Sequence, residues 1–421
     1  MLAIAAIAIV QAALTGAPAA RTPGFDERRY ELWATNLYRL GFYGDTATSK
    51  LAKEELRSVP YSAYVPPGYP FMLVTLKELH ADDAATRRGV QAALVGLIVL
   101  TAGLISLRLF GPLAALLSEA ILVATGVLPT YAQLNMSEIL FTATLFGSIA
   151  LAFFGLRRRS WHLLVCSGLL LGYAILVRPQ VLLLPVPIAI YIAFVTGRSR
   201  LALALGAVFL VAAYGVVAPW TIRNELRLHA FVPVASYTWL NLWEVNNPSA
   251  NGHFVRPERT IPDEVRRIRG LPEIQQDNEW RRLALSWIRA HPSKAVIGWV
   301  RDVGLFFSYP DPYIRDWYTL HGWRPPRLDE RVIYPLVFIA AVLALAYRRR
   351  WGEIWLLVIV AGYFVGFFSV FLPLARYRMP LLPFLAIFAA GVPEMLIGLR
   401  AGPRARTEPA EMPDAPTAVL V

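Results

Sequence analysis

FDERRYELWATNLYRLGFYG, residues 25–44, directly follows the first apolar segment of the chain. The stretch opens with two adjacent carboxylates, Asp26 and Glu27. Aromatic and apolar residues then recur at helical spacing: Tyr30, Trp33, Leu37 and Leu40. This pattern predicts an amphipathic helix that lies along the outer face of a membrane and holds Asp26 over a pocket.

The rest of the chain is apolar enough to build that membrane body. Of its 421 residues, 56% are hydrophobic, and they come in long uninterrupted blocks. The formal net charge of +12 does not indicate a nucleic-acid partner, because the basic residues cluster in short loops between apolar blocks. Cys166 is the only cysteine, so no intrachain disulfide can form. The composition predicts a polytopic membrane protein.

A membrane-spanning helix needs about 20 mainly apolar residues. On that basis we predict an all-α fold with about ten transmembrane helices. They lie near residues 1–20, 90–109, 112–129, 138–156, 161–177, 180–196, 201–219, 331–347, 353–372 and 380–399. The first segment lacks a basic start, so we expect a retained helix rather than a cleaved signal peptide.

Arginine runs set the expected orientation. With the N-terminus inside, every short basic loop falls on the cytosolic side, including Arg157–Arg159 and Arg348–Arg350. Two long outer segments remain, 21–89 and 220–330, and the second contains a predicted helix over 277–290. We expect one domain over residues 1–400 and a disordered cytosolic tail over 401–421. The predicted location is the bacterial plasma (inner) membrane, crossed several times, with the site on its outer face.

Several charged residues fall at the outer ends of helices, where the positive-inside bias gives no reason for a cation. They are Arg178, Arg223, Arg376 and Arg378, with Glu138 at the start of a span. Each one alone is more often a snorkelling or ion-paired side chain. Together they predict a phosphate site, because a guanidinium group presents a rigid fork of donors. Asp26 beside a lipid phosphate suggests a base for sugar transfer.

The order of motifs supports this interpretation. DERRYELWATNL, PPGYPFML, NMSEILF, GYAILVRP, PWTIRN and RYRMPLLPFL together resemble the blocks of the C-type (GT-C) polytopic glycosyltransferases. The resemblance is to the branch of protein O-mannosyltransferases and aminoarabinose transferases, and it runs from about residue 25 to about residue 395. It implies a polyprenyl-phosphate sugar donor, an essential acid at Asp26 with Glu27 beside it, and phosphate contacts at Arg223 and at Arg376 or Arg378. Tyr69 and Tyr377, within these blocks, are further candidate site residues.

The chain departs from those relatives in two respects. Val65 stands where the aminoarabinose transferases carry a lysine, and the sequence ends soon after its last predicted span. Some relatives bind a divalent cation, so a metal stays open as a cofactor. His253 is a candidate ligand, but a lone loop histidine is usually solvated, and we predict no metal site.

The sequence therefore predicts a membrane glycosyltransferase, with Asp26 as catalytic base, that uses a polyprenyl-phosphate sugar and an acceptor hydroxyl on a protein, lipid or glycan. The alternative is a transporter or flippase of lipid-linked sugars. It would need polar groups near the bilayer midplane and internal symmetry, and only Glu119 lies at such depth. A polymerase of lipid-linked oligosaccharides is chemically close and stays open. The sugar and the acceptor are not encoded in readable motifs.

Overall fold

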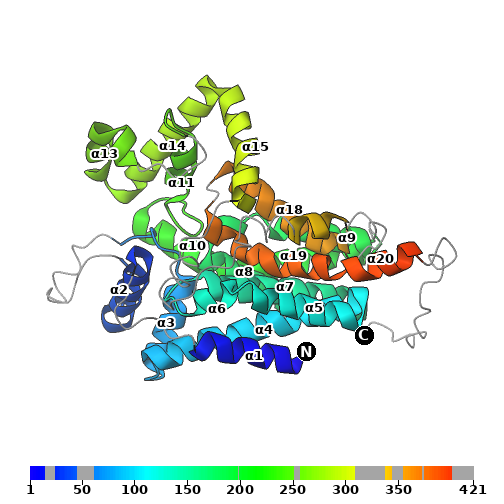
Figure 1. The fold of residues 1–421 in the computed structure, drawn as a ribbon. Coiled ribbons are helices and arrows are strands. Elements are labelled where there is room, and N and C mark those ends of the chain that lie inside the picture. The colour runs from blue at the N-terminus through cyan, green and yellow to red at the C-terminus, as the bar shows by residue number, and fades with distance from the viewer. Residues whose placement is uncertain are drawn as a thin grey trace, which may run out of the picture.

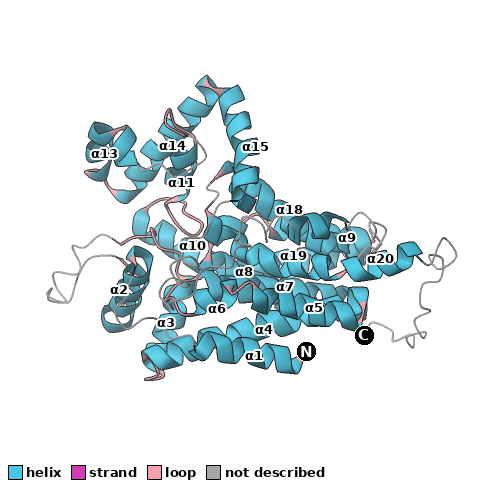
Figure 2. Ribbon diagram, in the orientation of Figure 1, coloured by secondary structure: helices cyan, strands magenta, loops and turns pink. Residues whose placement is uncertain are grey.

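The computed structural model describes residues 1–14, 24–44, 61–197, 199–250, 257–308, 337–343, 354–371 and 374–400. The regular elements among these residues are all helices, and no strand occurs among them (Figure 2). The tail after residue 400, His253 and most of the predicted span at 331–347 lie outside the described residues.

Long apolar helices form the body of the molecule, as predicted. Four segments are long and apolar enough to cross a membrane: α4 (Ala84–Phe110), α7 (Glu138–Arg158), α10 (Arg200–Leu228) and the segment Arg376–Ile397. Shorter apolar helices accompany them: α1 (Leu2–Leu14), α5 (Pro112–Ala124), α8 (Trp161–Val177), α9 (Pro185–Val195) and α18 (Ile354–Val370). The membrane-spanning, all-helical fold is therefore confirmed, and the count of about ten spans stays a prediction.

These helices lie side by side with their axes roughly parallel (Figure 1). α7 packs against α8, α8 against α10, and α4 against both α1 and α5. α19 (Leu382–Ala390) packs on α4 and α5, and α20 (Val392–Arg400) continues from it. The main apolar core runs through this bundle and includes fully buried aromatic rings such as Phe146 and Phe384, which meet edge to face.

Several predicted spans differ in extent from the observed helices, among them 112–129 and 201–219. α5 ends at Ala124 rather than at 129, because Gly126 adopts the left-handed backbone (φ 65°) and a separate short helix, α6 (Val127–Ala132), begins there. α10 continues past residue 219 to Leu228, despite Pro219. Its last two turns are held by the chain that follows, since Trp220 Nε1 donates to Val234 O at 2.9 Å.

Polar and amphipathic elements gather at one end of the bundle, away from Met1 (Figure 1). They include α2 (Phe25–Leu40), α3 (Gly68–Glu78), α11 (Thr238–Val245), α12 (Pro257–Thr260), α13 (Pro262–Arg269) and α14 (Glu273–Ala290). α2 is the amphipathic helix expected from its spacing: it buries Trp33 completely and ends at Gly41, which adopts the left-handed backbone (φ 63°).

A small second core holds the outer helices together. Leu242 and Trp243 of α11 pack with Trp280 of α14 and with Val265 and Ile268 of α13. α15 (Pro292–Ser308) follows α14 and returns to the bundle beside α18. The outer helices therefore form a cover over one end of the membrane body.

Candidate active site

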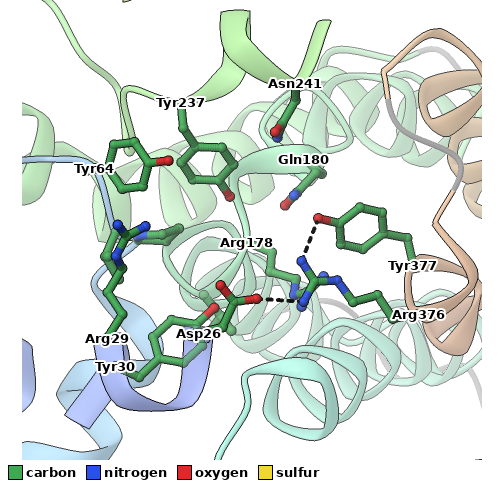
Figure 3. A pocket seen from close by; sticks show the side chains of 13 residues that line it. Asp26, Arg29, Tyr30, Tyr64, Arg178, Gln180, Tyr237, Asn241, Arg376 and Tyr377 are labelled. Atoms are coloured by element: carbon green, nitrogen blue, oxygen red, sulfur yellow. Dashed lines mark hydrogen bonds and ion pairs between the residues drawn. The ribbon is translucent and has the colours of Figure 1, made fainter. Parts of the chain in front are cut away.

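A cavity of about 170 Å³ lies between this cover and the helix ends (Figure 3). Its walls come from the start of α2, the loop before α3, the end of α8, the start of α11, and two short 3-10 helices, η3 (Pro179–Val181) and η4 (Ala375–Leu381). Of the predicted site residues, Asp26, Arg178, Arg376 and Tyr377 line it. Segments from both ends of the sequence therefore meet at one place.

Asp26 and Arg376 form an ion pair in this cavity. Arg376 Nη1 donates to Asp26 Oδ2 at 2.7 Å, and the two side chains keep 21% and 36% of their surfaces exposed (Figure 3). The Nε atom of Arg376 is buried without a hydrogen-bond partner among the described residues. The guanidinium group therefore has a donor left over for a ligand.

Arg178 is held more deeply by a second carboxylate. Its Nη2 donates to Glu138 Oε1 at 2.5 Å, and its Nε donates to Ser137 Oγ at 3.1 Å. Glu138 is only 1% exposed, and it also lies 4.0 Å from Arg376 Nη1. Because Glu138 opens α7, which runs from this end of the bundle, it fixes one arginine and approaches the other.

Tyr377 links the two arginines. Its ring centroid lies 5.2 Å from the guanidinium carbon of Arg178 and 5.1 Å from that of Arg376, and Arg376 Nη2 donates to its hydroxyl at 3.3 Å. The ring itself is buried and stacks on Phe368 of α18. A neutral aromatic face between two cations holds them close without neutralising them.

The electrostatic balance keeps Asp26 ionised. Burial raises the pKa of its carboxyl, but the charge and hydrogen bond of Arg376, followed by the charges of Arg178 and Arg29, outweigh that effect. The net result is a pKa below the ordinary aspartate value. Asp26 is therefore a carboxylate at neutral pH, and its basicity depends on how tightly Arg376 holds it.

Glu27 faces away from Asp26. Its Oε2 accepts from the backbone N–H of Gly24 at 2.6 Å, and its Oε1 accepts from the N–H of Asn135 at 2.9 Å. It borders a second cavity of about 390 Å³ on the other side of α2, lined also by Arg87 and Gln91. Glu27 thus caps the helix that carries Asp26 and anchors it to the segment between α6 and α7.

Three other predicted residues lie outside the lining of the first cavity. Arg223 donates to Ser62 O at 2.9 Å and stacks over Trp220, and Arg378 is 1% exposed and donates to Phe306 O at 3.3 Å. Tyr69 is buried, and its hydroxyl donates to Asn135 Oδ1 at 2.8 Å. These side chains support the walls of the cavity.

The cavity also contains side chains that the sequence did not single out. Arg29 lies over the ring of Tyr64, with 4.6 Å between its guanidinium carbon and the ring centroid. Gln180, Tyr237 and Asn241 complete the lining on the far side. Arg29 lies one turn after Asp26 on α2, and Gln180 follows Arg178 by two residues, so spacing offered a signal for these two. No charge pattern marked Tyr237 or Asn241.

The residues present do not fit a divalent cation. In the described part of the chain, no group of three or more His, Cys, Asp or Glu side chains could hold a metal ion. The carboxylates of the site, Asp26 and Glu138, are each engaged by an arginine. The donor set therefore suits an anion.

The chain is similar to one protein family and to several solved structures. A family model described as dolichyl-phosphate-mannose-protein mannosyltransferase matches residues 64–223. No curated protein matches the sequence. Among solved structures, the oligosaccharyltransferase of Archaeoglobus fulgidus in its apo form shares 12% identity at a TM-score of 0.55, covering 95% of this chain and 51% of that one.

The same archaeal enzyme, solved with an inhibitory peptide and a dolichol-phosphate, gives 14% identity and a TM-score of 0.53 over 95% of this chain and 51% of that chain. ArnT from Cupriavidus metallidurans bound to undecaprenyl phosphate gives 16% identity and a TM-score of 0.41, covering 98% of this chain and 80% of that chain. The present chain spans about half the length of the oligosaccharyltransferase, whose fold it shares. The family match and the shared fold confirm the resemblance to the C-type polytopic glycosyltransferases that the sequence motifs predicted.

Proposed function

We propose that the protein is a membrane glycosyltransferase that moves a sugar from a polyprenyl-phosphate donor to an acceptor hydroxyl. The observation that carries this proposal is the meeting of Asp26 with Arg376 and Arg178 in one cavity at the helix ends. A carboxylate and two guanidinium groups supply the two functions that the reaction needs, a proton acceptor and stabilisation of a leaving phosphate.

Arg376 and Arg178 are the proposed phosphate contacts. Arg376 has an unpartnered Nε, and both guanidinium groups border the cavity beside Tyr377. Of the four arginines predicted for this role, these two have access to the cavity, whereas Arg223 and Arg378 are engaged by backbone carbonyl groups in its walls. The isoprenoid tail would lie along the apolar helices. The dolichol-phosphate in the archaeal oligosaccharyltransferase structure supports a lipid phosphate of this kind.

The site is proposed to face the non-cytosolic side. α7 begins at Glu138 in the site and ends at Arg158 after 21 residues, which at about 1.5 Å per residue places its basic end about 30 Å away. α10 begins at the basic end, at Arg200, and ends near the cover. Under the positive-inside rule, the arginine-rich ends lie in the cytosol and the cavity outside.

Asp26 would accept the proton of the incoming hydroxyl. The acceptor oxygen attacks the anomeric carbon while the bond between that carbon and the phosphate oxygen breaks, and the bonding electrons leave with polyprenyl phosphate. In the structure Arg376 holds Asp26 and lowers its pKa. A donor phosphate that draws Arg376 away would raise that pKa, so donor binding would make Asp26 a better base.

The decisive experiment compares wild type with Asp26→Asn in transfer of labelled sugar from polyprenyl-phosphate donors to protein, lipid or glycan acceptors. We expect transfer to fall by about 100-fold or more, as is typical for loss of a general base. Binding of polyprenyl phosphate should persist, since both arginines remain. Asp263→Asn on α13, which is solvent-exposed, is the matched control. Undiminished transfer by Asp26→Asn would remove the basis of the proposal.

A further inference from the structure

The cavity has a second, uncharged side that the proposed base and phosphate contacts leave unused. Figure 3 shows Gln180, Tyr237 and Asn241 on the side away from Asp26 and Tyr30. Amide and phenol groups of this kind donate and accept hydrogen bonds without carrying charge. They can therefore form hydrogen bonds with the hydroxyl groups of a ligand.

Gln180 has an unsatisfied acceptor at this wall. Its side chain is 9% exposed and lines the cavity, and its Oε1 has no hydrogen-bond partner in the part of the chain that the structure describes. Its backbone is fixed, because Tyr363 Oη donates to Gln180 O at 2.6 Å. A buried polar atom without a partner costs about 1–3 kcal/mol. An orphaned oxygen held in place at a cavity wall therefore indicates a donor supplied by a ligand.

Asn241 faces the same space from another element. It lies one turn after Tyr237, the N-cap residue of α11, and both side chains line the cavity. Its half-buried amide has no hydrogen-bond partner among the described residues, whereas the neighbouring Asn246 and Asn247 both bond to backbone carbonyls. Asn241 is thus the amide on this helix that is left for a ligand.

The charged residues at the cavity favour an uncharged sugar over a sugar that carries an ammonium group. Its charged lining consists of Arg29, Arg178 and Arg376 against the single acid Asp26, which Arg376 already pairs. Glu244, one turn beyond Asn241, is buried behind this wall and does not line the cavity. Glu138, behind the lining, pairs Arg178, so a sugar carrying an ammonium group would find both carboxylates of the site already paired with an arginine. An uncharged sugar would meet the amides and tyrosines.

We propose that Gln180 and Asn241 bind the hydroxyl groups of an uncharged donor sugar and so set donor specificity. Gln180 is separated from Arg178 by Pro179 alone, so the sugar contact and the phosphate contact are adjacent, as they are in a sugar phosphate. This inference rests on the proposed transferase function and deepens it. It assigns the donor to the class of polyprenyl-phosphate neutral hexoses rather than amino sugars.

The test measures binding of three ligand classes to the purified full-length protein in detergent. The ligands are polyprenyl phosphate, its mannosyl, glucosyl and galactosyl derivatives, and a derivative with a 4-amino sugar. We expect wild type to prefer at least one neutral hexosyl form over bare polyprenyl phosphate. Gln180→Leu and Asn241→Leu should each reduce that preference about tenfold, the equivalent of one hydrogen bond. Affinity for bare polyprenyl phosphate should stay unchanged.

Matched controls carry the same substitutions outside the cavity, at the exposed Gln275→Leu and Asn278→Leu of α14. Gln180→Glu provides a second variant, because a new carboxylate at this wall should shift preference toward the amino sugar. An equal loss of affinity for the bare and the glycosylated lipid, or a wild type that prefers the amino sugar, overturns the subsite. A wild type that binds no polyprenyl phosphate at all instead overturns the proposed function on which the subsite rests.

Discussion

Asp26 and Arg376 lie 350 positions apart in the sequence, yet Arg376 Nη1 donates to Asp26 Oδ2 at 2.7 Å. The pair joins α2 to η4, where the apolar segment Arg376–Ile397 begins. A donor phosphate would compete with Asp26 for the same guanidinium group. In the proposed reaction, phosphate binding and the basicity of Asp26 would therefore be coupled through the side chain of Arg376.

Replacing Arg376 with lysine tests this coupling. Lysine keeps the positive charge but loses the planar fork that serves Asp26, Tyr377 and a ligand together. We expect affinity for polyprenyl phosphate to fall roughly 10- to 100-fold, the loss of about 1.5–3 kcal/mol from charged hydrogen bonds. Binding is measured by fluorescence titration in detergent, with the exposed Arg289→Lys of α14 as control. Unchanged affinity in Arg376→Lys would show that this arginine does not hold the phosphate.

The buried pair of Arg178 and Glu138 should respond differently to single and double substitution. Arg178→Met leaves Glu138, 1% exposed, without its partner, and we expect a loss of stability of about 3–5 kcal/mol. The double variant Arg178→Met/Glu138→Gln removes both charges and should regain most of that stability while still binding donor phosphate poorly. Thermal unfolding in detergent and lipid-phosphate binding give the two readouts. A double variant that binds as well as wild type would contradict the role of Arg178.

At Gly68, the start of α3 packs so closely against the end of α8 that there is no room for a side chain. A Cβ at this position would lie 2.5 Å from Val177 N and 2.8 Å from Leu176 C, at the end of α8. Gly68→Val must therefore push α3 away from the residue that precedes Arg178, at a cost of about 1–3 kcal/mol. We expect lower thermal stability together with weaker phosphate binding. Gly89→Val, which meets open space on α4, is the control, and equal stability of the two variants would refute the packing argument.

The raised pKa of Glu244 predicts that the free energy of unfolding depends on pH. Burial, and secondarily the nearby Glu258, raise the pKa of its carboxyl from the ordinary 4.5 to about 8. Between these values the unfolded chain has released the proton and the folded protein retains it. The unfolded state therefore binds fewer protons, and stability falls as pH rises, by up to about 1.4 kcal/mol per pH unit.

Glu244→Gln should reduce that fall, so that the variant gains stability relative to wild type from about pH 5 to pH 8. Asp277 of α14, with its pKa raised to about 7 by burial, adds a slope of the same sign, and the variant should keep that part. Melting temperatures across this range, with the exposed Glu225→Gln as control, check the prediction. Parallel curves for Glu244→Gln and wild type would argue against it.

The sequence located the parts of the site that depend on where helices end. Arg178 and Arg376 each follow or precede an apolar block, and Asp26 opens an amphipathic helix, so topology alone brought them to one end of the bundle. The sequence could not distinguish these cavity residues from Arg223, which lies near the end of α10 at the same end of the bundle. The direction of that side chain is set by packing against Trp220 and by carbonyl acceptors from residues far away in sequence.

The neutral residues that we propose to bind the sugar were not predicted from the sequence, for a related reason. Gln180 and Asn241 carry no charge that would be out of place at a membrane boundary, so nothing in hydropathy or in the positive-inside bias marks them. Their significance appears only when a cavity is present and their amides are found facing it. The helix end at Ala124 was missed because the left-handed backbone of Gly126 outweighed an apolar run that continues beyond it.

The two carboxylates at the start of α2 have different positions: Asp26 lines the first cavity, and Glu27 accepts hydrogen bonds from the backbone. Glu27 is occupied by two peptide N–H groups, one from its own helix start and one from the segment leading into α7. Its neighbour Asp26 is consequently mounted on main chain that has little freedom to swing. The position of the proposed proton acceptor is therefore set by the backbone scaffold, and its partner, Arg376, is the side chain that would move when a substrate enters.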